Sequence, residues 1–240
     1  MSSMKGKIVL ITGGASGYGN AMVKRFNEEG AQVIAADINA AMLEEAKGEN
    51  PSIDTYILDV TNAEKWKEIS AYISAKYGRI DILINNAGGA ISVKEQIAQE
   101  DRIIEKIIAL NLTSVAYGCK YFGQIMKEQK EGTIINISSD CSRHAWPGFG
   151  VYSAAKAGVV NLSKGLFVEL RPYNVRVTTI IPGAGNTNFS KNAGIAEPDE
   201  PYKLGRPELA EAALHICLQP QYIMVEEYML SGTEREIIPM

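Results

Sequence analysis

Short apolar runs alternate with segments of helical spacing along most of this chain. The runs KIVLIT (7–12), QVIAAD (32–37) and IDILINN (80–86) are apolar along most of their length, and not at every second residue. This pattern is typical of strands that are buried on both faces of a sheet. We predict strands at residues 7–12, 32–37, 53–60, 80–86, 133–139 and 175–182.

The segments between these strands have the spacing and the stop signals of helices. We predict helices at 20–30, 40–48, 62–78, about 99–131, from near Tyr152, and from near Arg206. Strands joined by helices make right-handed crossovers, so the pattern predicts an α/β fold: a Rossmann-type doubly wound parallel sheet with helices on both faces. We expect residues 1–240 to form one domain, with ligands bound beyond the carboxyl ends of the strands.

Composition and charge exclude several classes of partner. The net charge is −4 and the 24 lysines and arginines are scattered, so we expect no nucleic-acid partner. The first apolar run is short and leads straight into glycines, which is too little for a signal peptide or a membrane span. The three cysteines and two histidines lack the spacing of a disulfide framework or a metal site. We therefore expect a cytoplasmic protein with no membrane partner and no metal.

A glycine-rich turn, TGGASGYG (12–19), follows the first predicted strand and precedes the first predicted helix. Glycines here permit a tight turn and a close approach of the backbone to a pyrophosphate, while the free N–H groups at the helix start face that anion. A plain surface loop is the alternative. The position of the turn favours dinucleotide binding, through Gly13, Ser16, Gly17, Tyr18 and Gly19.

Asp37 ends the second predicted strand, about twenty residues beyond the glycine-rich turn. A carboxylate at this place accepts hydrogen bonds from the hydroxyls of an adenosine ribose and repels a 2′-phosphate. The next two residues, Ile38 and Asn39, add no positive charge that would attract such a phosphate. We therefore predict NAD as cofactor in preference to NADP, with a helix N-cap as the alternative role for Asp37.

Ordered motifs along the chain resemble those of the short-chain dehydrogenase/reductase family, from about Lys7 to the carboxyl end. They are the turn at 12–19, N-N-A-G at 85–88, the asparagine of N-L at Asn111, Ser139, Y-x-x-x-K at Tyr152 and Lys156, and P-G at Pro182 and Gly183. A lone Y-x-x-x-K is more often part of an ordinary amphipathic helix. The ordered combination is what makes the resemblance specific.

The resemblance implies a set of cofactor contacts beyond the glycine-rich turn. They come from Asp59, Val60, Asn86, Tyr152, Lys156, Pro182, Gly185 and Thr187. Each has a structural alternative: Asp59 could cap the next helix, Asn85 and Asn86 could be turn residues, and Pro182 could simply end a strand. For Asn85, a structural role that ties strands together is the better prediction.

The resemblance also assigns four residues to catalysis. Tyr152 is the general acid or base, Ser139 hydrogen-bonds the substrate oxygen, Lys156 also binds the nicotinamide ribose, and Asn111 holds a water that relays protons to Lys156. A free phenol has a pKa near ~10, and a lysine one helical turn away is expected to lower it. The alternative for Asn111 is a buried polar link within a helix.

The sequence departs from the family pattern at two positions in this region. Tyr18 stands where an aliphatic residue is common, and Gly185 replaces a common valine or isoleucine, so we expect a looser loop at 185. The segment 184–205 is short, which predicts a small flap and a small substrate. The carboxyl-terminal part loosely resembles the branch of serine and other small hydroxy-acid dehydrogenases, and Arg143 is a candidate substrate contact.

These observations predict an NAD-dependent short-chain alcohol dehydrogenase that interconverts a small secondary alcohol and its ketone. An NADP-linked carbonyl reductase and a non-catalytic dinucleotide-sensing regulator are the alternatives. The resemblance further implies a homotetramer, or a homodimer, built on the helices near 99–131 and after Tyr152. Burial of their small residues within one subunit is the alternative.

Overall fold

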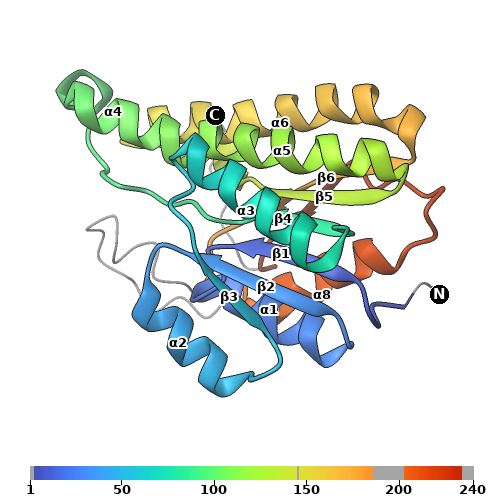
Figure 1. Cartoon of the computed structure of the whole chain (residues 1–240). Coiled ribbons are helices and arrows are strands. Elements are labelled where there is room, and N and C mark those ends of the chain that lie inside the picture. Colours follow the sequence, from blue (N-terminus) through green and yellow to red (C-terminus); the bar gives the residue numbers. More distant parts are fainter. Residues whose placement is uncertain (1–2, 145, 186–202, 234–240) are drawn as a thin grey trace.

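One parallel sheet carries the strands of the chain in the order β3-β2-β1-β4-β5-β6-β7 (Figure 1). The computed structural model describes residues 3–144, 146–185 and 203–233. Within them the strands are β1 Ile8–Thr12, β2 Gln32–Asp37, β3 Asp54–Ile57, β4 Ile82–Asn85, β5 Gly132–Ile137, β6 Val175–Pro182 and β7 Glu227–Leu230. The strand order reverses between β1 and β4, which is where ligands bind in sheets of this kind.

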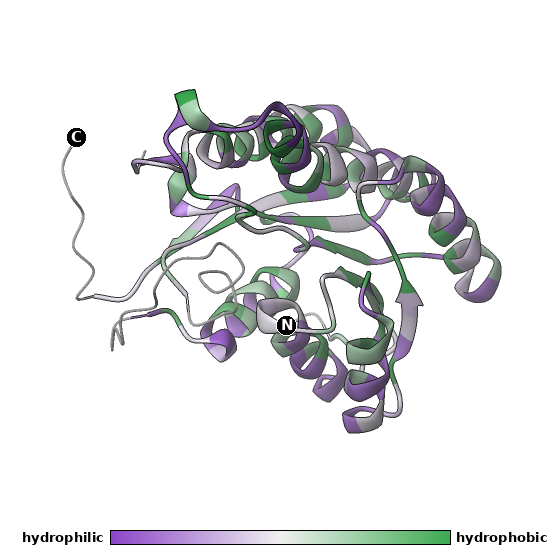
Figure 2. Ribbon diagram, turned by 90° about the vertical axis from the view of Figure 1, so that its left-hand side faces the viewer, coloured by the Kyte–Doolittle hydropathy of each residue, from purple (hydrophilic) through white to green (hydrophobic). Residues whose placement is uncertain are grey.

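Helices cover both faces of the sheet (Figures 1 and 2). They are α1 Gly17–Glu28, α2 Ala40–Glu49, α3 Ala63–Tyr77, α4 Asp101–Ile108, α5 Ser114–Gln129, α6 Gly150–Leu170 and α8 Arg206–Leu218. One apolar cluster joins the sheet to α1, α2 and α8, and a second joins it to α3, α5 and α6. Strands buried from both sides explain why their sequences are apolar along their length. The predicted fold class is confirmed.

The helix predicted near 99–131 is observed as one helical stretch over residues 101–129. Within it a π-helical turn, Ala109–Thr113, lies between α4 and α5 and contains Asn111. This turn was not predicted, because its setting is tertiary: the Asn111 side chain bonds the backbone of Gly89, far away in sequence. Strand β7 was not predicted either. It pairs with β6 at the edge of the sheet and is only partly buried, so it lacks a fully apolar run.

Between residues 3 and 233, leaving out 145 and 186–202, no helix is long and apolar enough to cross a membrane. The same part of the chain contains no group of three or more His, Cys, Asp or Glu side chains that could hold a metal ion.

Candidate active site at the carboxyl ends of the strands

The glycine-rich turn has a backbone that larger residues could not adopt. Gly13 and Gly17 have φ of 64° and 54°, in the left-handed region. A Cβ on Gly19 would lie 1.9 Å from the Gly13 carbonyl oxygen. Ser16 precedes α1 without capping it through its side chain, so the N–H groups of the first turn can serve a bound anion. The turn therefore fits the pyrophosphate of a dinucleotide.

Thr12 and Asn86 hold this turn in place. The Thr12 hydroxyl accepts hydrogen bonds from the N–H groups of Asn86 and Ala87, both at 3.0 Å. The Asn86 side chain donates to the Thr12 carbonyl at 2.9 Å. Asn85 points the other way, into the core, where it donates to Asn136 of β5 at 2.8 Å. The structure thus gives Asn85 the strand-tying contact and places Asn86 against the turn.

Asp37 lies beside the same turn. One carboxylate oxygen accepts from the Ala15 N–H at 3.2 Å and the other from the Asn39 N–H at 3.0 Å. The N-cap of α2 is Asn39, whose side chain accepts from Met42, so the capping alternative for Asp37 is wrong. Its negative charge is placed where β2 ends next to the predicted phosphate site.

Asp59 and Val60 follow β3 at the same edge of the sheet. Asp59 accepts hydrogen bonds from the N–H and the hydroxyl of Thr61, and the cap of α3 is Asn62. The helix-cap alternative for Asp59 is therefore also wrong. Val60 is buried, and its carbonyl accepts from the Trp66 indole at 2.8 Å. Their predicted contact with adenine stays a prediction.

Ser139, Tyr152 and Lys156 come together where β5 ends against α6. Tyr152 hydrogen-bonds Ser139, and the Lys156 Nζ atom lies 5.8 Å from the centroid of the Tyr152 ring. Lys156 donates to the Ile137 carbonyl at 3.0 Å. The hydroxyl of the neighbouring Ser138 donates to the Lys156 carbonyl, which leaves Ser139 as the serine that faces Tyr152.

Burial dominates the electrostatics of this group. Withdrawal from water raises the pKa of the Tyr152 phenol, and the nearby Cys141 and Asp140 add to the increase. Burial also lowers the pKa of Lys156 to about 8. In the chain by itself the pKa of Tyr152 is therefore raised, and Lys156 is not among the groups that shift it. A lowering of this pKa by Lys156 together with an oxidised nicotinamide stays a prediction.

Asn111 and Lys156 approach each other across Gly88. The Asn111 side chain donates to the carbonyls of Gly89 and Ile107, both at 3.0 Å, and accepts from the Gly89 N–H at 2.9 Å. A Cβ on Gly88 would lie 2.9 Å from the Asn111 Oδ1 atom and 3.1 Å from the Lys156 Nζ atom. The lack of a side chain at 88 thus leaves room between the two groups.

The two departures from the family pattern are neighbours in space. A Cβ on Gly185 would lie 1.6 Å from the Tyr18 hydroxyl oxygen, so the tyrosine ring occupies the room that a side chain at 185 would need. The Tyr18 hydroxyl donates to the Leu204 carbonyl at 3.4 Å, and Gly185 pairs with Leu204. Tyr18 thus packs against Gly185 itself, while the loop that follows it, expected to be looser, lies outside the described residues.

The remaining predicted site residues have mixed outcomes. Pro182 is the last residue of β6, next to β7. Arg143 forms an ion pair with Glu227 of β7, so its charge is matched within the chain and its substrate contact stays a prediction. Thr187, and the flap predicted at 184–205 apart from its two ends, lie outside the described residues.

Three residues that matter for the site were given no role of their own from the sequence, although two of them stand in the quoted motifs. They are Thr12, which anchors the turn, Gly88, which separates Asn111 from Lys156, and Asp140, which is 5% exposed and bonds Ser139. The adjacency of Asp140 to Ser139 was a usable signal. The roles of Thr12 and Gly88 depend on contacts between distant segments, which spacing along the chain does not reveal.

Comparisons with known proteins agree with this geometry. The sequence profile described as short chain dehydrogenase matches residues 7–198. A 3-oxoacyl-acyl-carrier-protein reductase, FabG, of Thermotoga maritima is 38% identical over 187 residues, which are 75% of this chain and 74% of the relative.

Two solved structures resemble the whole chain. A closed form of serine dehydrogenase complexed with NADP+ has a TM-score of 0.92 at 29% identity and covers 97% of this chain and 98% of its own. A 3-ketoacyl-acyl-carrier-protein reductase of Brucella melitensis complexed with NADH has a TM-score of 0.87 at 28% identity, over 96% and 99%. From the profile match and the relatives, the chain is a member of the short-chain dehydrogenase/reductase family.

Proposed function

We propose that this oxidoreductase interconverts a small secondary alcohol and its ketone, with NAD(H) as cofactor and Tyr152 as general acid and base. The observation that carries the proposal is the meeting of Ser139, Tyr152 and Lys156 beside the glycine-rich turn. A nicotinamide held there would supply or accept the hydride, which is chemistry of the cofactor and not of the protein. The chain's own residues have to move and hold a proton.

Tyr152 suits the donation of that proton during ketone reduction. Its pKa is raised by burial, so the phenol is protonated at neutral pH and ready to protonate the developing alkoxide. Alcohol oxidation needs the phenolate, which a positive charge beside the ring would stabilise. Lys156, with its pKa lowered to about 8, exchanges protons near neutral pH and connects to Asn111 across Gly88. This arrangement supports the role of Asn111 in a proton relay.

Asp37 supports the preference for NAD over NADP. Its carboxylate is fixed beside the turn by two backbone N–H groups and would repel a 2′-phosphate. One of the similar structures holds NADP+ and another NADH, so relatives use both forms. We expect kcat/KM to be higher with NAD, and the Asp37→Ser variant to reduce or invert the ratio. A ratio that favours NADP in the unmodified protein would contradict the proposal.

The substrate class follows from the short segment between β6 and α8 and from the relatives. The similar serine dehydrogenase makes small hydroxy acids the first candidate class, and since serine itself carries a primary alcohol, primary hydroxy acids belong in the test beside secondary ones. The acyl-carrier-protein reductases make β-ketoacyl thioesters the second candidate class, supported by the 38% identical relative. A screen of NADH formation and consumption across both classes separates them.

The variant Tyr152→Phe tests the chemistry. It removes one hydroxyl, and we expect kcat to fall by about 10²–10⁴-fold while binding of NADH, followed by its fluorescence, is retained. Full activity would disprove the assignment. Bound dinucleotide with no turnover on any substrate would favour the alternative of a dinucleotide-sensing regulator.

We further propose a cytoplasmic homotetramer, with a homodimer as the alternative. Some small residues of α6 pack within one chain and need no partner copy to account for them. Ala155 is buried, and Gly158 packs against Leu112, where a Cβ on residue 158 would lie 3.0 Å from the leucine side chain. Ala154 is exposed and remains available for a partner copy. Light scattering of the purified protein measures the number of subunits.

A further inference from the structure

A buried carboxylate lies directly beside the reacting hydroxyl groups. Asp140 follows Ser139 in a short 3-10 turn, Asp140–Ser142, and is 5% exposed. Its backbone carbonyl accepts from the N–H groups of Arg143 and His144, at 2.8 and 3.0 Å. These bonds fix the turn, and with it the place of the Asp140 side chain, at the end of β5.

The hydrogen bonds of Ser139 have a definite direction. Its hydroxyl donates to the Asp140 carboxylate at 3.0 Å and accepts from the Cys141 N–H at 3.2 Å. These two bonds fix the place of the Ser139 oxygen. The hydrogen bond between Ser139 and Tyr152 acts to lower the pKa of the phenol, against the larger effect of burial.

We propose that Asp140 is a positioning residue, which holds the Ser139 hydroxyl and thereby fixes the place of its oxygen at the end of β5. This inference rests on the proposed function. The Ser139 oxygen is then in place before a substrate oxygen arrives. A hydrogen bond to a carboxylate is stronger than one between neutral groups, so Asp140 holds this hydroxyl more firmly than a neutral residue would.

The charge of Asp140 also acts on the phenol, in the sense opposite to the Ser139 hydrogen bond. Besides burial, it contributes to the raised pKa of both Tyr152 and Tyr18. It thus favours the protonated phenol, the form that donates a proton to a ketone. Relative to a neutral residue at 140, we expect Asp140 to assist ketone reduction more than alcohol oxidation.

Three variants separate the effect of the Ser139–Asp140 hydrogen bond from that of the Asp140 charge and from a loss of folding. Asp140→Ala removes both, and we expect kcat for ketone reduction to fall about tenfold with an unchanged KM for the dinucleotide. Asp140→Asn keeps an acceptor for the serine proton, so its loss should stay within about threefold. In the Ser139→Ala background, Asp140→Ala should cause no further loss, because the residue through which it acts is gone.

Asp81 provides a matched control, since it is also 5% exposed but lies at the opposite edge of the sheet, where it accepts from the Ile8 N–H. Asp81→Asn should lower the melting temperature and leave kcat per folded molecule unchanged. A tenfold loss from Asp140→Ala that persists in the Ser139→Ala background would overturn the proposal. An equal loss from Asp140→Asn and Asp140→Ala would do so too.

A readout independent of turnover distinguishes failure of this inference from failure of the proposed function. Turnover by the unmodified protein tests the function alone. Crystal structures of the unmodified protein and of Asp140→Ala test the positioning role, even when no substrate is found. We expect the Ser139 hydroxyl oxygen to move when its carboxylate partner is removed. An unmoved oxygen would show that Asp140 does not position Ser139.

Discussion

Charged groups are buried equally well where the strands of the sheet begin (the amino edge) and where they end (the carboxyl edge). The two sites differ in how many fixed partners surround the buried charges. At the edge formed by the amino ends of the strands, Asp81 is 5% and Arg176 is 7% exposed. At the edge formed by the carboxyl ends, Asp140 is 5% and Lys156 is 3% exposed. Burial alone therefore does not tell a structural charge from a functional one.

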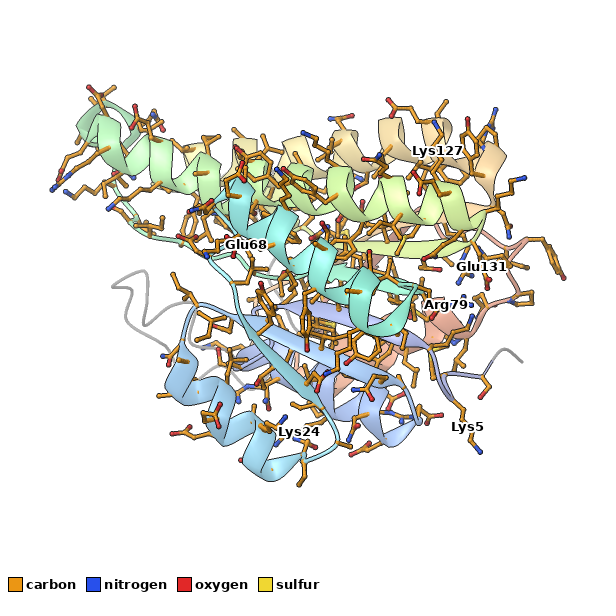
Figure 3. All side chains as sticks on the ribbon, viewed as in Figure 1. Lys5, Lys24, Glu68, Arg79, Lys127 and Glu131 are labelled. Atoms are coloured by element: carbon orange, nitrogen blue, oxygen red, sulfur yellow. The ribbon has the colours of Figure 1, made fainter. Side chains whose placement is uncertain are left out.

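The charges at the amino edge are surrounded by fixed partners. Asp81 accepts from the Ile8 N–H at 2.8 Å and pairs with Lys7 and Arg79. Figure 3 shows Arg79 and Glu131 together at this end of the sheet, where they form a further ion pair. These hydrogen bonds and ion pairs offset the free-energy cost of removing the charges from water.

Arg176 continues this pattern at the start of β6. Its guanidinium donates to the Thr133 hydroxyl and to the carbonyls of Cys217 and Gln219. These bonds join β5, β6 and the end of α8. An always-charged group with several fixed acceptors is suited to hold elements together and unsuited to exchange a proton.

Lys156 at the carboxyl edge has a different setting. Among the described residues its ammonium donates to the Ile137 carbonyl and lies close to the Tyr152 ring and to Asn111 across Gly88. Burial with little compensation lowers its pKa to about 8. The comparison teaches that the count of fixed partners, more than burial, distinguishes the proposed proton-exchanging group from the structural one.

The largest expected effect comes from removing each buried cation in turn. We expect Lys156→Met to reduce kcat by about 10²-fold or more, because proton exchange with Tyr152 is lost, with little change in melting temperature. We expect Arg176→Met to destabilise the fold by about 3 kcal/mol, because four acceptors lose their donor, with kcat per folded molecule retained. Steady-state kinetics and chemical denaturation of both variants measure these effects.

The reverse result would break the comparison between the edges. A Lys156→Met protein that unfolds while Arg176→Met loses only activity would place the structural charge at the carboxyl edge. The protein with Lys156→Arg is a useful addition, because it keeps the positive charge but has a group that does not release its proton near neutral pH.

The sequence predicted the sheet better than the contacts at its edges. The strand over 175–182 agrees with β6 to the residue, because a run that is buried on both faces is apolar throughout. The π-helical turn at Asn111 and the strand β7 were missed. The first depends on a bond to the backbone of Gly89 and the second on pairing with β6, and neither leaves a local pattern.

The same limit applies to the candidate site. Motif order alone predicted that Ser139, Tyr152 and Lys156 belong together. It also flagged Tyr18 and Gly185 as departures, but as separate ones, since nothing in the spacing relates positions so far apart. Their contact is a property of the folded chain, as is the position of Gly88 between Asn111 and Lys156.

The next largest effect is expected where Tyr18 packs on Gly185. Gly185→Val places a side chain on the Tyr18 hydroxyl, so the ring must move and disturb the glycine-rich turn. We expect the Kd for NADH to rise about tenfold or more, measured by fluorescence titration. The double variant Tyr18→Ile with Gly185→Val removes the clash and should recover most of the affinity.

Gly165 gives the control for this pair, since a Cβ there meets no atom within 4 Å. Gly165→Ala should bind NADH like the unmodified protein. Normal affinity of the single variant Gly185→Val would show that Tyr18 does not fix this end of the segment. Failure of the double variant to recover would mean that the two positions act separately.

A smaller effect is expected at Gly88, between Asn111 and Lys156. A methyl group there would lie about 3 Å from both polar atoms and fill the space between them. We expect Gly88→Ala to lower kcat several-fold, with a larger solvent isotope effect because proton exchange with Lys156 becomes slower. Gly89→Ala is the matched control, since a Cβ at 89 meets nothing within 4 Å. Equal losses in the two variants would rule out a role for this space.

The smallest effect is a difference in how stability depends on pH at the two edges. Lys156 releases its proton at about 8 in the folded chain and near 10.5 when unfolded. Between these values the unfolded chain binds more protons, so the Lys156 contribution to stability rises with pH, by about 1–3 kcal/mol. Lys7 behaves oppositely. Burial lowers its pKa, but Asp81 and Glu131 outweigh burial, so the net pKa of Lys7 is raised. The Lys7 contribution to stability is therefore complete below pH 10.5 and is lost only above it.

Denaturation at pH 7.5 and 9.5 tests this difference, below the range in which tyrosines ionise in the unfolded chain. The free energy of unfolding of Lys156→Met, relative to the unmodified protein, should fall between these two pH values. That of Lys7→Met should stay constant. The thiol of Cys141 acts on the pKa of Lys156, so the measurement is repeated in a Cys141→Ser background. A constant difference for Lys156→Met in both backgrounds would mean that the buried lysine keeps its proton, and the contrast between the two edges would then rest on their hydrogen bonds alone.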